Sequence, residues 1–363
     1  MGPSLNRWGP GQLADTCDAK CEGHARYSHR VIGRYPTPVQ RLSSLSTDRC
    51  ELWVKRDDLT NETYGGNKVR KLEHILERAR ERSARRIVTF GAAGSHHVLA
   101  TTVHGRKAGL EIAAILTPQP RSEHAIENLR VALSLGLEPI RASTMALAPV
   151  VLLTVLREGD FVVGPGGSTL EGTLGYVEAA LELARQIENR ALPVPDAIVV
   201  ALGSGGTVAG LLAGIAGLGA TGAASSIAAP SLAETRLVAV RIVSPVLMGR
   251  RRALLLAWRA AHHRHLGVSW DDLAARLALE SRFLGAGYGH ATAAGDRAMD
   301  LAEKNGLALD ATYTAKAFAA ALDLVEKARF PRVLYWHTLS SVRLAPMLRG
   351  APQLPPELDR LFT

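Results

Sequence analysis

The sequence has few of the residues that would tie this chain to a metal or to an oxidising compartment. Of its 363 residues only three are cysteines, Cys17, Cys21 and Cys50, and three thiols cannot all pair. Cys17 and Cys21 with His24 have the spacing of a metal half-site, but zinc needs four ligands and no second half follows downstream. We therefore expect reduced thiols and no bound metal.

Long apolar runs are also missing. The first thirty residues lack the apolar stretch that a signal peptide needs, and no later run is long enough to span a bilayer without a charge or a glycine. Residues 1–34 are polar, with scattered glycine and proline, and we expect an N-terminal arm there. These absences favour a cytoplasmic protein with no membrane partner.

Positive charge is the main imbalance in the composition, with a formal net charge of +9. Much of the excess lies in Arg78–Arg86 and near Arg250–Arg252, where other residues interrupt the basic ones at helical spacing. We interpret both segments as solvated helix faces, although such a charge can also draw anionic substrates toward a cleft. Because no nucleic-acid module is recognisable, we expect no nucleic-acid partner.

Aromatic residues are scarce, at 5% of the chain against 47% hydrophobic residues. A core of Ala, Leu and Val suits helices packed on a parallel sheet better than a β-sandwich. Apolar strands alternate with helical segments along the chain, which predicts an α/β protein with open parallel sheets and two domains. The expected strands are 51–55, 87–90, 112–116, near 139, 161–163, 197–202, 237–242 and 333–336, and 217–230 is expected to be a loop.

The loop Gly203-Ser204-Gly205-Gly206-Thr207 follows a fully apolar strand and enters a helix. Glycines let backbone N–H groups turn inward, the two hydroxyls add donors, and a helix N-terminus favours an anion. A phosphate cradle is one interpretation, and a tight turn that needs glycine for steric reasons is the other. Neither the Walker pattern nor the dinucleotide fingerprint fits these residues.

Lys68 follows the glycine turn Gly65-Gly66-Asn67 and begins a helical pattern. The partial positive charge of a helix N-terminus disfavours a charged amine there. A lowered pKa would favour the neutral amine that attacks an aldehyde, whereas the alternative is an ordinary solvated lysine after a turn. Position alone does not separate the two.

Three further places carry residues able to take part in chemistry. Ser95 and His96 stand at the start of a helix, where a serine hydroxyl and N–H groups can hold a carboxylate or simply cap the helix. Tyr288 and Tyr313 stand among glycines and threonines and are candidates for proton transfer. Thr338 follows a strand end, where open α/β folds place ligand contacts. A lysine, a phosphate turn and a carboxylate turn together match an enzyme with an aldehyde cofactor.

The chain resembles a known enzyme family in these same segments. The specific segment is Lys55–Thr60 followed by Gly65-Gly66-Asn67-Lys68, and it is similar to the cofactor-lysine segment of the D-cysteine desulfhydrase and aminocyclopropane-carboxylate deaminase family. The resemblance extends in order from about Tyr35 to Leu344. It implies pyridoxal 5′-phosphate as cofactor, a small amino acid as substrate and a tryptophan synthase β-like fold, in which two open parallel-sheet domains carry helices on both faces.

The resemblance also implies roles by position. The implied cofactor-binding residues are Asn67, Lys68, His96, Gly203, Ser204, Gly205, Gly206, Thr207, Thr314 and Thr338, and the implied catalytic residues are Lys68, Ser95, Tyr288 and Tyr313. We expect residues 35–70 and 168–363 to form a large cofactor-binding domain and 71–167 a small domain. We also expect a homodimer.

Three departures bear on the reaction. Where deaminases of the family have an acidic residue, this chain has Thr314, and a neutral hydroxyl near the pyridine nitrogen favours β-elimination. His96 stands in place of the family's Asn, and Leu339-Ser340 replaces a glycine pair and adds bulk near the pocket floor. We expect a desulfhydrase-like lyase that releases a keto acid and ammonia. The alternatives are a cyclopropane-opening deaminase, a β-replacement enzyme and a non-catalytic protein that binds the cofactor.

Overall fold

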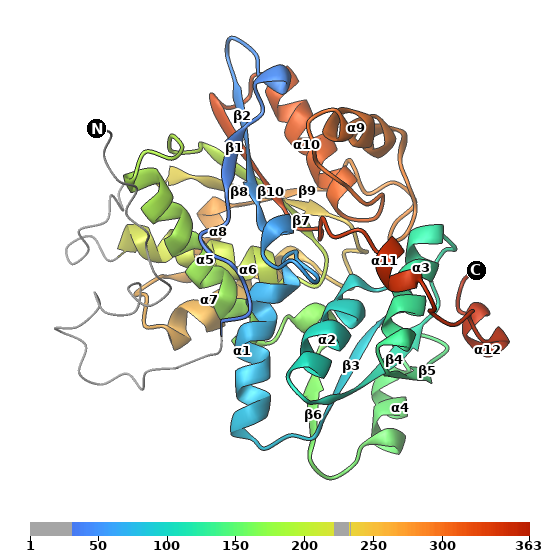
Figure 1. Cartoon of the computed structure of the whole chain (residues 1–363). Helices are drawn as coiled ribbons and strands as arrows, with labels where there is room; N and C mark the ends of the chain where they lie inside the picture. The colour runs from blue at the N-terminus through green and yellow to red at the C-terminus, as the bar shows by residue number, and fades with distance from the viewer. Residues whose placement is uncertain (1–30, 221–231, 233) are drawn as a thin grey trace, which may run out of the picture. The chain divides into compact units, whose positions relative to one another are not determined.

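Two β-sheets organise the chain in the computed structural model, which describes residues 31–220, 232 and 234–363 (Figure 1). The larger sheet has the order β1-β2-β10-β7-β8-β9. All neighbours in it are parallel except β1, which pairs antiparallel with β2. Its strands are β1 (Val39–Arg41), β2 (Glu51–Arg56), β7 (Ala197–Leu202), β8 (Arg236–Arg241), β9 (Leu277–Glu280) and β10 (Arg332–His337).

The smaller sheet is parallel throughout and has the order β5-β4-β3-β6. Its strands are β3 (Arg86–Ala92), β4 (Glu111–Thr117), β5 (Leu137–Arg141) and β6 (Asp160–Val163). The predicted α/β class with two open parallel sheets is therefore confirmed, and every expected strand is present. β1 (three residues) and β9 (four residues) are strands that the sequence did not predict.

Helices cover both faces of the larger sheet, with α5 to α8 on one side and α9 and α10 on the other (Figure 1). The helices are α1 (Lys68–Glu81), α2 (His96–Lys107), α3 (Glu123–Ser134), α4 (Ala148–Val155), α5 (Leu170–Glu188), α6 (Gly206–Ala220), α7 (Arg250–His263), α8 (Trp270–Arg276), α9 (Ala293–Glu303), α10 (Thr314–Glu326), α11 (Ala345–Leu348) and α12 (Pro356–Asp359). The loop expected at 217–230 is wrong over 217–220, which continue α6, and the rest of it lies outside the described residues. The arm expected at 1–34 also lies outside the described residues as far as residue 30, and Cys17, Cys21 and His24 lie there too.

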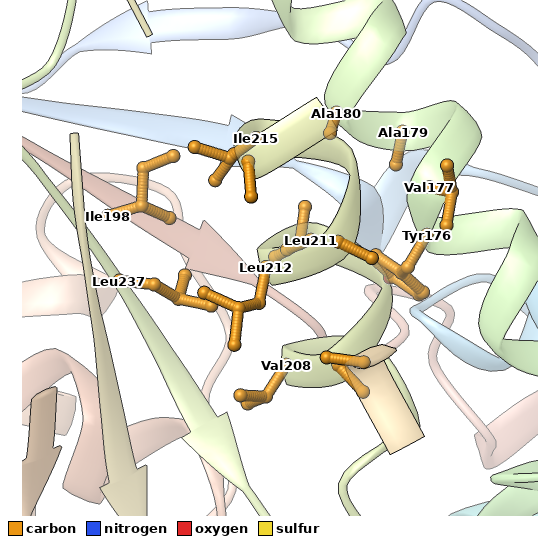
Figure 2. Packing of buried hydrophobic residues seen from close by; sticks show 14 of the residues in the cluster. Tyr176, Val177, Ala179, Ala180, Ile198, Val208, Leu211, Leu212, Ile215 and Leu237 are labelled. Carbon is orange, nitrogen blue, oxygen red and sulfur yellow. The ribbon is translucent and has the colours of Figure 1, made fainter. Parts of the chain in front are cut away.

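The main apolar core lies between α5, α6 and the sheet (Figure 2). Val208, Leu211, Leu212 and Ile215 project from α6 toward β7, β8 and α5. Glycine sets the close approach of the two helices, because a Cβ at Gly210 would lie 2.4 Å from the carbonyl oxygen of residue 173. The start of α6, which carries the predicted phosphate loop, is thereby fixed against the sheet.

A buried polar cluster holds α1 against the larger sheet. Arg70 of α1 donates to both carboxylate oxygens of Asp57, at 2.8 and 3.0 Å, and to Glu182 of α5. Tyr176 and Trp336 each donate to Asp57 Oδ2 at 2.7 Å. Although burial opposes ionisation of Asp57, Arg70 and the other donors lower its pKa to about 2. The helix that begins with the candidate lysine is thus anchored two residues further on.

No helix among the described residues is long and apolar enough to cross a membrane. The domain boundaries at 35–70, 71–167 and 168–363 stay a prediction.

Candidate active site

A cavity of about 740 Å³ lies where the carboxyl ends of strands from both sheets meet. Loops after β3, β4 and β6 line it from the smaller sheet, and loops after β7 and β10 line it from the larger one. Nearly every residue singled out from the sequence lines this cavity: Asn67, Lys68, Ser95, His96, Gly203, Ser204, Gly205, Thr207, Tyr288, Tyr313, Thr314 and Thr338. Gly206 is the exception, and it begins α6 directly behind the loop. The structure brings the candidates together, while their roles stay predictions.

Lys68 is the first residue of α1, as the sequence predicts. Its Nζ donates to Asn67 Oδ1 at 3.1 Å, and Asn67 Nδ2 donates to Thr207 Oγ1 at 3.0 Å. Burial lowers the pKa of the Lys68 amine to about 8, although the negative charge of Asp310 opposes this. A substantial fraction of the amine is therefore neutral near physiological pH, as a nucleophile requires.

The turn before Lys68 is fixed by the segment after β10. Gly66 adopts a positive φ of 86°, and the backbone N–H of Asn67 donates to the carbonyl oxygen of Thr338 at 3.0 Å. Ser340 Oγ accepts from the N–H of Gly65 at 2.9 Å. Leu339 is buried and lines the cavity. Thr338 and Ser340 therefore hold the lysine turn, while Leu339 adds bulk to the cavity wall.

The glycine loop faces a second cation, Lys71, which sequence reasoning missed. Lys71 lies one helical turn after Lys68, and its Nζ donates to Ser168 Oγ at 3.2 Å and to the carbonyl oxygen of Gly166 at 3.1 Å. Ser168 Oγ lies 2.7 Å from Ser204 Oγ and accepts from the Gly206 N–H at 2.9 Å. The i, i+3 spacing from Lys68 was the signal that could have found it.

Lys71 is a buried amine surrounded by neutral oxygens. Burial and the nearby Lys68 lower its pKa well below the usual range. None of the ion pairs formed within the described parts of the chain includes Lys71. A phosphate on the Ser204–Thr207 loop would supply the missing negative charge, so these residues fit a phosphorylated ligand.

Ser95 caps α2, since its Oγ accepts from the N–H groups of His97 and Val98 at 3.2 and 3.5 Å. The hydroxyl hydrogen remains available, and Ser95 lines the cavity. The cap and the carboxylate-binding role that we considered are therefore compatible. Both ring nitrogens of His96 contact protein groups, namely Tyr64 Oη at 2.8 Å and His124 Nε2 at 3.2 Å. Burial, with the neighbouring His124, lowers the pKa of His96 to about 3, so the ring is neutral.

Tyr288 and Tyr313 face one another across the cavity wall. The Tyr313 hydroxyl donates to that of Tyr288 at 2.9 Å, and the rings meet edge to face at 5.6 Å. Burial raises the pKa of Tyr288 to about 12 and raises that of Tyr313 well above its usual value. Both hydroxyls are protonated at neutral pH, and the Tyr288 hydrogen is left to donate into the cavity.

Thr314 has an acidic partner that the sequence did not single out. Its Oγ1 donates at 2.6 Å to Oδ1 of Asp310, which is buried and lines the cavity. Burial opposes ionisation of Asp310, but its surroundings, which include donation from Thr314 and Tyr313, hold its pKa below the usual range. A carboxylate thus stands behind the hydroxyl. Its signal was an Asp four residues before Thr314, within reach of the N–H groups where α10 begins.

Comparison with known proteins identifies the family. Residues 32–338 match the model of the family described as pyridoxal-phosphate dependent enzyme. The D-cysteine desulfhydrase of Salmonella paratyphi A is 33% identical over 318 residues, which are 84% of this chain and 91% of that protein. This chain belongs to the pyridoxal-phosphate dependent enzyme family.

Solved structures support the same assignment for this pyridoxal-phosphate dependent enzyme. The crystal structure of an ACC deaminase homologue is 28% identical, with a TM-score of 0.72 over 89% of this chain and 96% of that one. A fungal L-serine ammonia-lyase from Rhizomucor miehei shares the fold, at 16% identity and a TM-score of 0.59, over 89% of this chain and 98% of that one. The predicted cofactor, pyridoxal 5′-phosphate, and the predicted fold are confirmed.

The cavity of this enzyme fits its cofactor on its own geometry. Lys68 offers an amine with a lowered pKa, and the loop beside Lys71 offers donors for a phosphate. In the described ranges, no group of three His, Cys, Asp or Glu side chains could hold a metal ion.

Proposed function

We propose that this enzyme is a lyase that eliminates the β-substituent of a small D-amino acid such as D-cysteine. The products are a keto acid, ammonia and the thiol leaving group. The overall change consumes one water, because D-cysteine and water together balance pyruvate, ammonia and hydrogen sulfide. The observation that carries the proposal is the buried Lys68 amine in the same cavity as a pair of protonated tyrosines, in a chain similar to D-cysteine desulfhydrase.

Lys68 would hold the cofactor, and the Gly203–Thr207 loop with Lys71 would hold its phosphate. When bound, pyridoxal phosphate supplies an electron sink that acidifies the α-hydrogen of the amino acid. Ser95 Oγ–H and the N-terminus of α2 would bind the substrate carboxylate, which fixes the α-carbon near Lys68.

Lys68 and Tyr288 share the proton transfers in this proposal. The Lys68 amine has a pKa of about 8, so in its neutral form it could take the α-proton of the bound amino acid. The Tyr288 hydroxyl carries its own hydrogen, since it accepts from Tyr313, and can donate to the departing β-substituent. Elimination then needs no second nucleophile.

The experiment compares wild-type protein with the Lys68→Ala variant. The control is Lys304→Ala, the same substitution at an exposed lysine. Loaded protein is incubated with D-cysteine, L-cysteine and aminocyclopropane carboxylate, and keto acid and sulfide are measured. We expect wild-type protein to form sulfide and pyruvate from D-cysteine. The rate of this reaction should fall by about a thousandfold or more in Lys68→Ala and stay the same in Lys304→Ala. Keto acid from the cyclopropane alone would instead support a deaminase. Turnover by Lys68→Ala equal to wild type would refute the proposal.

Two alternative functions would give different results in these assays. A β-replacement enzyme would release sulfide from D-cysteine only when a second nucleophile is added. A non-catalytic protein would turn yellow with the cofactor yet exchange no α-proton of any amino acid in deuterated water. The homodimer and the cytoplasmic location are also proposals, and sedimentation velocity and localisation of a tagged chain test them.

A further inference from the structure

Three side chains form a continuous hydrogen-bonded row from the cavity wall to the surface. Tyr64 is 3% exposed and lines the cavity, and its Oη lies 2.8 Å from His96 Nδ1. His96 Nε2 lies 3.2 Å from His124 Nε2, with ring centroids 4.9 Å apart. His124 is exposed at the start of α3. The row therefore joins the cavity to solvent without a gap.

The hydrogen bonds in this row are all donated in the same direction, from Tyr64 toward His124. Asn128 Nδ2 lies 2.9 Å from the carbonyl oxygen of Gly94, which only accepts, so the amide nitrogen of Asn128 is fixed on that side. The same nitrogen lies 3.5 Å from His96 Nδ1. Burial raises the pKa of Tyr64, so its hydroxyl stays protonated and also donates there. With donors on two sides, His96 Nδ1 is an acceptor and Nε2 carries the hydrogen.

His96 Nε2–H then donates to His124 Nε2, which leaves the His124 hydrogen on Nδ1 of an exposed ring. His96 thus accepts from Tyr64 on one side and donates to the solvent-exposed His124 on the other. An imidazole can pass a proton because it has one N–H and one acceptor nitrogen, whereas an amide has no equivalent pair. The residue type at position 96 is what makes the row continuous.

We propose that Tyr64, His96 and His124 conduct protons between the cavity and solvent, and that this row exchanges the substrate-derived proton with water. A proton reaching Tyr64 Oη displaces its own proton to His96 Nδ1, the His96 Nε2 proton moves to His124 Nε2, and the His124 Nδ1 proton leaves to water. Only O–H and N–H bonds form and break. The outward transfer leaves both imidazoles in their other tautomer, and the reverse sequence, which carries a proton inward from water, returns them to the first. The inference rests on the proposed function.

The surroundings keep the His96 ring neutral. Burial is the main cause. His124 and Lys68 also disfavour positive charge on His96, whereas Asp310 favours it. With burial, the balance places the His96 pKa at about 3. A neutral ring can pass protons without storing charge in the cavity.

The kinetic test uses D-alanine, which has no β leaving group, so only its α-hydrogen exchanges. Holoenzyme in deuterated water is followed by proton NMR for loss of the α-hydrogen signal. We expect His124→Ala to lower the exchange rate by about tenfold or more, and added imidazole to restore it, because the site is open to solvent. His263→Gln, an exposed histidine on α7, is the control and should exchange like wild type. An unchanged rate in His124→Ala, or no rescue by imidazole, overturns the proposal.

A second readout needs no substrate. Nitrogen NMR of histidine-labelled protein should show His96 as a neutral ring with hydrogen on Nε2, and Tyr64→Phe should shift its Nδ1 signal. Hydrogen on Nδ1 of His96 would overturn the proposed direction. A protein that exchanges the α-hydrogen of no amino acid refutes the proposed function. The nitrogen NMR result then tests the direction of the hydrogen bonds in the row independently.

Discussion

Replacing Arg70 by methionine tests how the buried polar cluster positions the active-site helix. Arg70 is 3% exposed, Asp57 is fully buried, and the guanidinium also bonds Glu182. Removing one partner of such a pair costs about 3–5 kcal/mol, because the other charge stays buried without its partner. Lys55 still pairs with Glu182, and Tyr176 and Trp336 still donate to Asp57, so we expect the lower end, about 3 kcal/mol.

The loss should depend on pH in a defined direction. The folded-state pKa of Asp57 is about 2, against an ordinary value of 3.8, and this difference corresponds to about 2 kcal/mol. That stability is present above the unfolded pKa and is lost as pH falls through about 2. Without Arg70, burial becomes the dominant influence on Asp57 and raises its pKa in the folded state. The variant therefore becomes more stable relative to wild type as pH falls. The difference between the two proteins should therefore shrink between about pH 7 and about pH 4.

Urea unfolding followed by circular dichroism at both pH values measures this difference, with both proteins free of cofactor. Arg329→Met is the matched control, because Arg329 is exposed, and it should change stability by less than about 0.5 kcal/mol. A loss below about 1 kcal/mol for Arg70→Met at pH 7, or a loss that grows toward pH 4, would refute the reasoning.

Three further predictions concern the cavity. Lys71→Met should weaken cofactor binding by about tenfold or more, measured by titration of the visible absorption, because it removes the cation beside the glycine loop; unchanged affinity would exclude a phosphate contact. Tyr288→Phe should lower turnover by about a hundredfold while leaving that titration unchanged, and a parallel loss of affinity would indicate a structural role. Since only the neutral Lys68 amine attacks the aldehyde, the rate of cofactor attachment should rise with pH through about 8 and then level off; a rate that falls over this range would contradict the assignment.

Much of the site could be predicted because its signals are local. Lys68 and the Gly203–Thr207 loop each lie where a glycine turn enters a helix, and a helix N-terminus has the same electrostatics wherever it stands in the fold. The strand before the loop was equally clear, since residues 197–202 are all apolar. The resemblance then supplied the cofactor that these local features fit.

Other contacts could not be read from the chain. Asp310 reaches Thr314 within one turn, but nothing local shows that both line a cavity. His96 and His124 are 28 residues apart and meet because α2 and α3 start at the same edge of the smaller sheet. The sequence singled out His96 yet did not indicate that both of its ring nitrogens contact other side chains.

The amino-acid sequence by itself determined the alternating architecture, the lysine at a helix start and the glycine loop, because hydrophobic period and turn chemistry act between near neighbours. Only the tertiary structure decided which charges are buried, which hydroxyls are committed and which rings touch. Burial and neighbouring charged groups shift the pKa of Lys68, His96 and Asp310, and both depend on segments that lie far apart along the chain.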